Sequence, residues 1–222
     1  MSALRKLTEA EAEGAEERLV FYNLTWDDYE KLLEAFKRHP GVRLTYCEGA
    51  LEIMVVSFEH EKIASYINSI IETVAVEWEK DYLPAGSTTF RLKPEERGFE
   101  PDGCFYFTHI RQLARKTRIN LLKDPAPDLA VEVDISSPSV SRFPIFARLG
   151  VKEVWRYHQD RVDFHHLRGE TYIRRESSKL LPGITAEAVT RLIDARNGMT
   201  APAWQKKVRE LAQEHRPVNR RQ

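Results

Sequence analysis

The stretch from Leu129 to Ile135 constrains the fold most, because large aliphatic residues occupy every second position along it. Such alternation predicts a β-strand with one apolar face. Side chains two residues apart on a strand lie on the same face. Glu132 and Asp134 are therefore expected to point the same way, beside the small side chain of Ala130.

Two carboxylates within an otherwise apolar strand are costly to bury unless something compensates their charge. A divalent cation would do so, because hard cations prefer oxygen ligands. An exposed sheet face or a buried salt bridge would explain the same pattern without a metal. A second acid favours the metal: Asp102 follows Pro101 directly before an aromatic-rich strand candidate that contains Phe105 and Tyr106. A proline before the aspartate suits a strand entrance, where the acid can face a cleft.

Composition limits the classes of protein that need to be considered. At 222 residues, the chain suits one domain with a sizeable core, or one domain with an appendage. Lys+Arg and Asp+Glu number 34 each, so any contact with DNA must come from a local basic patch. Two cysteines, Cys47 and Cys104, show neither a disulfide framework nor metal-type spacing, which indicates a reducing compartment. No apolar run reaches membrane-spanning length and no signal-peptide core is visible, so we expect a cytoplasmic protein.

The periodic patterns predict an α/β fold with a mixed sheet of about five strands. A long helix from Glu59 to Tyr82 is expected across one face, with a second helix against it. A hairpin is expected from Arg43 to Val56, turning at Glu48-Gly49. The expected organisation is an N-terminal lead-in (residues 1–20, frayed or a peripheral helix), a main domain (residues 21–187) and a C-terminal helical extension (residues 188–222). That extension could cover its own domain, bind a partner subunit or contact DNA, and we favour the first two.

Five motifs occur in a defined order, and together they carry a family resemblance. They are Tyr46–Met54, Glu59–Glu61, Glu100–Asp102, Pro127–Val133 and Arg142–Trp155. Their order and spacing resemble the Uma-two-type restriction endonucleases of the PD-(D/E)xK nuclease superfamily, over roughly residues 20 to 185. The resemblance implies a restriction-endonuclease-like mixed sheet flanked by helices, and a DNA substrate. We expect a homodimer.

The resemblance also implies roles for individual residues. Asp102 and Glu132 would bind Mg²⁺ or Mn²⁺, with the backbone carbonyl of Val133 as a further ligand. Magnesium needs few carboxylate oxygens and keeps several waters, which suits an open cleft. In the family, the histidine that corresponds to His60 lies next to the catalytic hairpin, where it could orient a water or transfer a proton. Glu52 interrupts an apolar run and could point to the same site. An exposed or capping histidine and a solvent-facing glutamate are the alternatives for these last two.

One position departs from the superfamily pattern. The usual lysine two residues after the glutamate is replaced by Asp134. In many relatives the lysine lies instead on the following helix, and here the matching residue is Arg142, one turn before Phe146. Arginine can bind a phosphate with two N–H groups, but its permanent charge prevents it from acting as a general base. Water activation would then depend on the metal, aided by His60.

These features lead to a metal-dependent endonuclease acting on DNA as the main hypothesis. The alternative is a catalytically inactive nucleic-acid-binding or oligomeric module with a vestigial site. A metal-independent hydrolase with a carboxylate pair, such as a glycosidase, is a third and weaker possibility. The basic segment from Thr108 to Lys123 is either a solvated helix or a flap that contacts phosphates. The hydrolase hypothesis would fail if Asp102 and Glu132 lay on opposite sides of the sheet, or if each were neutralised by its own basic neighbour.

Overall fold

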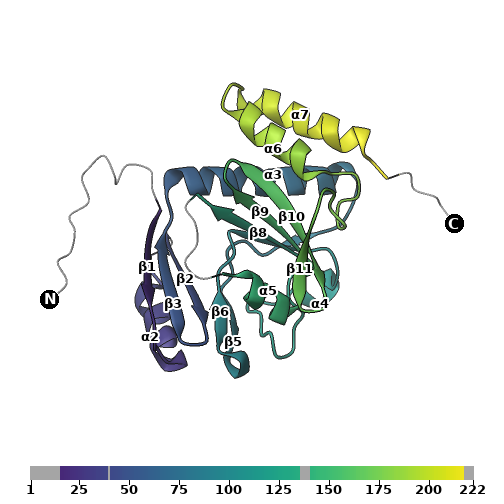
Figure 1. Ribbon diagram of the computed structural model, residues 1–222. Helices are drawn as coiled ribbons and strands as arrows, with labels where there is room; N and C mark the ends of the chain where they lie inside the picture. Colours follow the sequence, from purple (N-terminus) through teal and green to yellow (C-terminus); the bar gives the residue numbers. More distant parts are fainter. Residues whose placement is uncertain (1–15, 40, 136–140, 218–222) are drawn as a thin grey trace, which may run out of the picture.

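The predicted strand exists and lies inside a six-stranded mixed sheet of the computed structural model, which describes residues 16–39, 41–135 and 141–217 (Figure 1). We call this the central sheet. Its strand order is β11 (Thr171–Arg175), β10 (Arg161–Arg168), β9 (Glu153–His158), β8 (Leu129–Asp134), β7 (Gly103–Tyr106) and β4 (Leu83–Pro84). The pairing of β8 with β9 is parallel, and the other pairings are antiparallel. Every residue of β8 is buried, which excludes an exposed sheet face as the explanation for its two acids.

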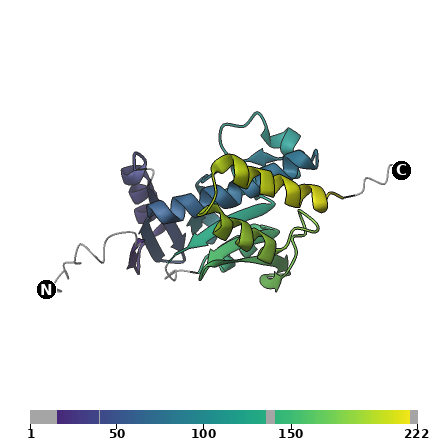
Figure 2. The same cartoon turned by 90° about the horizontal axis from the view of Figure 1, so that it is seen from above.

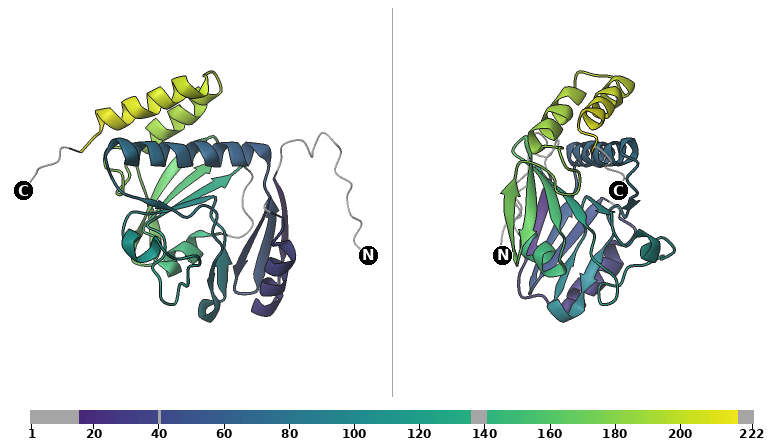
Figure 3. Two further views of the ribbon diagram at one scale, coloured as in Figure 1. Left: turned by 180° about the vertical axis from the view of Figure 1, so that it is seen from behind. Right: turned by 90° about the vertical axis from the view of Figure 1, so that its right-hand side faces the viewer.

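The long helix α3 (Phe58–Glu77) covers one face of the central sheet. Its buried aliphatic side chains recur at steps of three and four residues and pack on Val131 and Val133, while Glu132 and Asp134 lie on the other face of β8. Helix α6 (Ala186–Arg196) packs on β10 beside α3, and α7 (Ala201–Glu214) packs on both helices (Figures 2 and 3). The indole N–H of Trp78 donates to the carbonyl of Ala212 at 2.6 Å. Within the described residues, the C-terminal helices therefore cover their own domain.

A second sheet lies beside the central one, although the sequence suggested a single sheet of about five strands. We call it the N-terminal sheet. All its pairings are antiparallel, in the order β1 (Glu17–Phe21), β3 (Ala50–Val55), β2 (Val42–Cys47), β6 (Arg97–Phe99) and β5 (Phe90–Leu92). The predicted hairpin is β2–β3, and positive φ angles at Glu48 and Gly49 make its tight turn. Helix α2 (Trp26–Phe36) packs on one face of this sheet and begins with a capping box between Thr25 and Asp28.

The expectation of a frayed or helical lead-in is wrong for residues 17–20, because they belong to β1 and pair with β3. This strand is short and follows a run of acidic residues, so its only local β signal is the pair Val20 and Phe21 at its end. Residues 1–15 lie outside the described part of the chain, as do residues 218–222 of the predicted C-terminal extension. The division of the chain near residues 20 and 187 stays a prediction.

An apolar cluster fills the space between the two sheets. It joins Phe90 and Phe99 of the N-terminal sheet to Ala130 of β8 and to Phe146 of α5 (Phe143–Leu149). Gly150 ends α5 in the left-handed conformation, which glycine adopts without a steric cost. The remaining short helices are η1 (Lys93–Glu95) and α4 (Ile110–Leu113). Among the helices of the described residues, none has both the length and the apolar character needed to cross a bilayer.

Asp128, just before β8, is a structural acid that closes the β7–α4 turn. It accepts hydrogen bonds from the N–H groups of Phe107 and Thr108, both at 2.8 Å, and from Lys152 Nζ at 2.6 Å. Burial would raise the pKa of Asp128, but Lys152 and these N–H groups outweigh burial and lower it. A carboxylate with a lowered pKa stabilises the fold above its unfolded-state pKa and loses that contribution as the pH falls.

We therefore expect Asp128→Ala to lower the free energy of unfolding by about 1–3 kcal/mol at pH 7, because two N–H groups lose their acceptor. The difference from the unmodified protein should shrink as the pH falls below about 4 and through the lowered pKa that Asp128 has in the folded protein. Urea unfolding at several pH values measures both effects, with Asp81→Ala at an exposed position as the control. A difference that grew towards low pH would contradict the assignment.

Candidate active site

Charged side chains from both sheets, α3 and the start of α5 gather at one end of β8. We call them the charged cluster. Its members are Glu16, Arg18, Glu52, His60, Asp102, Glu132, Asp134, Arg142 and Arg156. Arg156 is the most exposed of them, with 24% of its side chain accessible, and the others are almost fully buried. All six acidic or basic residues proposed from the sequence, the histidine included, lie in this cluster.

Asp102 and Glu132 lie across from each other on adjacent strands. Gly103 is the register partner of Val131, so Asp102, one residue earlier, lies opposite Glu132. Asp102 Oδ2 accepts the N–H of Val133 at 2.8 Å. The N–H and C=O of one strand residue point to the same edge, so the Val133 carbonyl also faces the edge where Asp102 lies. The two predicted acids and the predicted carbonyl are therefore close neighbours.

His60 lies in the first turn of α3, between two carboxylates. Its Nδ1 contacts Glu16, and its Nε2 lies 2.8 Å from Asp102 Oδ1. Burial lowers the pKa of His60, but the contacts with Asp102 and Glu16 more than offset burial and raise it to about 9. The imidazole is therefore a cation at neutral pH. Its contact with Oδ1 holds the carboxylate of Asp102 in place. The exposed-histidine alternative is wrong, since the side chain is buried.

Arg142 links Glu132 to the N-terminal sheet. Its Nη1 contacts Glu132, its Nε lies 3.2 Å from Thr45 Oγ1, and its Nη2 lies 3.5 Å from Glu52 Oε1. Burial raises the pKa of Glu132, and the positive charge of Arg142 opposes that rise. Arg142 itself keeps its proton, because Glu132, together with Asp102 and Asp134, raises its pKa in spite of burial. The solvent-facing alternative for Glu52 is wrong, because Glu52 is fully buried.

Asp134 is held by two further arginines. Arg156 Nε lies 2.7 Å from Asp134 Oδ2, and Arg18 Nη2 lies 3.4 Å from Asp134 Oδ1. Arg18 also contacts Glu52 at 2.9 Å and Glu16 at 2.7 Å. Asp134 therefore forms salt bridges in the position where the superfamily has a lysine.

Sequence reasoning missed Glu16, Arg18, Thr45 and Arg156. Glu16 and Arg18 were assigned to the lead-in, and Thr45 is an ordinary strand residue. The sequence around Arg156 offered a signal that could have identified it, because its immediate neighbours in the strand, Trp155 and Tyr157, are both aromatic. In the parallel pairing it lies directly opposite Glu132.

The donor atoms fit a hard divalent cation with few protein ligands. Glu132 Oε1 is buried and accepts no hydrogen bond from any described residue. Five carboxylates in the cluster face three guanidiniums and one imidazolium, so acids exceed bases. Across residues 16–39, 41–135 and 141–217, no three Asp, Glu, His or Cys side chains are arranged to hold a metal. Asp102, Glu132 and the Val133 carbonyl would leave Mg²⁺ with several waters, as it prefers.

Both acids nevertheless contact a basic side chain, Asp102 through His60 and Glu132 through Arg142. Neutralisation of each acid by its own basic neighbour counts against hydrolysis. The second oxygen of Glu132 has no donor among the described residues, so Arg142 neutralises this acid through one oxygen.

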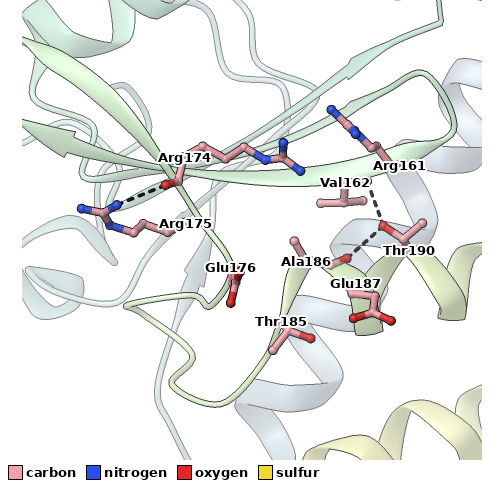
Figure 4. A pocket seen from close by; sticks show the side chains of 9 residues that line it. All are labelled: Arg161, Val162, Arg174, Arg175, Glu176, Thr185, Ala186, Glu187 and Thr190. Carbon is pink, nitrogen blue, oxygen red and sulfur yellow. Dashed lines mark hydrogen bonds between the residues drawn. The ribbon is translucent and has the colours of Figure 1, made fainter.

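A hollow of about 330 Å³ opens beside the cluster. Its lining combines the acids Glu132 and Asp134 with two guanidiniums, Arg142 and Arg156, and with the ring of Phe143. A second hollow, of about 700 Å³, lies between β10, β11 and the start of α6 and contains no cluster residue (Figure 4).

The basic segment 108–123 begins at the opposite end of β8 from Asp134, where Thr108 contacts Asp128. The start of this segment therefore lies away from the charged cluster. That position does not support a flap that contacts phosphates at the cluster. Further along the segment, Lys116 is paired with Asp124 at 2.6 Å.

Gly103 lets α3 approach β7 next to Asp102. A Cβ at Gly103 would lie 2.1 Å from Asn68 Oδ1, and Asn68 Nδ2 donates to the Asp102 carbonyl at 3.3 Å. We expect Gly103→Ala to lower the free energy of unfolding by about 1–3 kcal/mol, because Asn68 must move. Thermal unfolding checks this, with Gly198→Ala, where a Cβ meets nothing within 4 Å, as the control. Adding Asn68→Ala should recover part of the loss, and no recovery would place the strain elsewhere.

Comparisons with known proteins found one family and a similar solved structure. The family model Uma2, described as "Putative restriction endonuclease", matches residues 26–194. Among solved structures, the chain is similar to a putative nuclease belonging to DUF820 from Anabaena variabilis ATCC 29413, with 16% sequence identity and a TM-score of 0.44. That match covers 86% of this chain and 98% of the other. No curated protein matches the chain.

Proposed function

Because the chain belongs to the Uma2 family of putative restriction endonucleases, we propose that it is a nuclease that hydrolyses phosphodiester bonds in DNA at the charged cluster. The observation that supports this most is the position of Asp102 opposite Glu132 on adjacent strands, with the Val133 carbonyl at the same edge. The sequence motifs of the family and the buried acids meet at this one place. The homodimer and the cytoplasmic setting stay predictions.

Asp102, Glu132 and the Val133 carbonyl would hold Mg²⁺ or Mn²⁺. When bound, such an ion relieves the charge on phosphoryl oxygens and lowers the pKa of a water. The chain's own contribution is to present the ligands. His60 and the Val133 N–H fix the two oxygens of Asp102, while Arg142 holds one oxygen of Glu132 and leaves the other available.

The two guanidiniums beside the hollow suit a phosphate. Arg142 and Arg156 line the hollow together with Glu132. Guanidinium groups bind phosphate oxygens through charge-assisted hydrogen bonds. Neither arginine can remove a proton from water, so the nucleophile must lose its proton by another route.

The test is cleavage of plasmid DNA by the purified protein with Mg²⁺ or Mn²⁺, with an excess of EDTA as the control. The proposal expects nicked or linear DNA with metal and intact DNA with EDTA. Intact DNA under all metal conditions would refute it.

The pairing of both acids with basic residues favours one alternative, an inactive nucleic-acid-binding or oligomeric module with a vestigial site. This alternative expects a shift of DNA in a gel without cleavage, or a dimer by light scattering without any effect of metal. A cleavage reaction that requires metal excludes it.

A further inference from the structure

We infer that Arg18 is a positioning residue of the active site and that its charge restrains the metal affinity of that site. The inference rests on the proposed nuclease function. Arg18 belongs to β1, which precedes the part of the chain that the family model matches. Nothing in the family motifs assigns it a role.

Arg18 connects the two sheets at the charged cluster. Its Nη1 lies 2.9 Å from Glu52 on β3 of the N-terminal sheet. Its Nη2 lies 3.4 Å from Asp134 on β8 of the central sheet. The same Glu52 oxygen lies 3.5 Å from Arg142, which in turn holds Glu132. Glu52 thus links Arg18 to Arg142, the residue that holds the proposed metal ligand Glu132.

The face of β1 that carries Arg18 is the buried one. Only 7% of the Arg18 side chain is exposed, whereas Leu19 and Phe21 on the opposite face are 61% and 45% exposed. The strand lies at the edge of the N-terminal sheet and pairs with β3 alone. The contact of Arg18 with Asp134 therefore joins β1 to the central sheet, in addition to the pairing of β1 with β3.

The charge of Arg18 also acts on the metal ligands through Asp134. Asp134 lies two residues after Glu132 on the same face of β8, so the net charge at Asp134 acts at short range on a cation held by Glu132. Arg18 offsets the charge of Asp134 and Glu52 by direct contact. Without it, the cluster becomes more negative and attracts a divalent cation more strongly. At the same time, Glu52 and Arg142 lose a fixed partner, so the geometry around Glu132 becomes less defined.

Two variants separate charge from position. Arg18→Gln removes the charge, and Arg18→Lys keeps the charge but cannot reproduce the forked contacts with Glu52 and Asp134. Mn²⁺ binding is measured by isothermal titration calorimetry without DNA, and kcat for DNA cleavage is measured at saturating Mn²⁺. Arg191→Gln removes an exposed charge from α6, and Leu19→Ser changes the outer face of β1; both serve as controls.

We expect Arg18→Gln to bind Mn²⁺ roughly threefold or more tightly than the unmodified protein, since a nearby positive charge is lost. Its kcat should fall by about tenfold or more, as is typical when a group that holds the reacting geometry is removed. Arg18→Lys should bind Mn²⁺ with unchanged affinity and should still lose kcat. A purely structural role would lower metal affinity and kcat together, in proportion to the loss of folded protein.

Unchanged metal affinity in Arg18→Gln, or weaker binding, overturns the inference. If Arg18→Gln does not fold, Arg18→Lys decides, and an unchanged kcat in that variant overturns the inference. Failure of the unmodified protein to bind Mn²⁺ would overturn the proposed function as well, whereas normal binding with no effect of Arg18 would leave that function standing.

Discussion

Glu132→Gln should abolish metal-dependent cleavage of DNA, lowering the rate by at least about a thousandfold. Metal-related stabilisation of the transition state is worth several kcal/mol, and each 1.36 kcal/mol is about a factor of ten in rate. A glutamine amide offers one weak oxygen in place of a carboxylate with two. It still gives Arg142 an acceptor, which limits the damage to the fold. Initial rates of plasmid nicking with Mn²⁺ measure the effect, and circular dichroism checks folding.

Glu153→Gln is the matched control. Glu153 is a buried glutamate on the neighbouring strand β9, where it accepts hydrogen bonds from Trp155 Nε1 at 2.6 Å and from the N–H of Lys179 at 2.9 Å. Its replacement also alters a buried carboxylate but leaves the charged cluster intact. We expect lower thermal stability with cleavage retained by the folded protein. Full activity of Glu132→Gln, or equal loss in both variants, would show that Glu132 has no special role.

Arg142→Ala should destabilise the protein by about 3–5 kcal/mol, because it leaves Glu132 buried without its positive partner. Thr45 and Glu52 lose a donor at the same time. We also expect cleavage to be lost, since the carboxylate is no longer held in place. Urea unfolding followed by tryptophan fluorescence gives the change in the free energy of unfolding.

A double variant distinguishes stability from function at this pair. Replacing Glu132 by Leu and Arg142 by Met removes both charges and keeps most of the volume, which is often neutral or stabilising for a buried ion pair. The double variant should recover most of the free energy lost in Arg142→Ala and still fail to cleave DNA. Recovery of cleavage together with stability would show that the ion pair serves the fold alone.

Local patterns identified the elements that carry the site. The alternation in Leu129–Asp134 correctly predicted a strand with Glu132 and Asp134 on one face. A buried salt bridge, which the sequence left open beside a metal, is present at both acids of β8. Those two explanations are compatible, because Arg142 occupies only one oxygen of Glu132.

Long-range pairing could not be predicted in the same way. Whether the β2–β3 hairpin joins the sheet of β8 or forms a second sheet depends on packing between distant segments, which no local period encodes. Arg18 and Asp134 are 116 residues apart in the chain. The short strand that carries Arg18 has little signal of its own, and its identity as a strand depends on its pairing with β3.

The position of β1 has a practical consequence for anyone who produces this protein. Glu16 and Arg18 lie at the very start of the described fold, and both reach into its interior. A deletion of residues 1–15 that joined a purification tag directly to Glu16 would place the tag beside the charged cluster. Helix α7 ends near Trp78, at the end of α3 that lies away from the N-terminal sheet, so a tag that follows α7 would start far from the charged cluster (Figure 1).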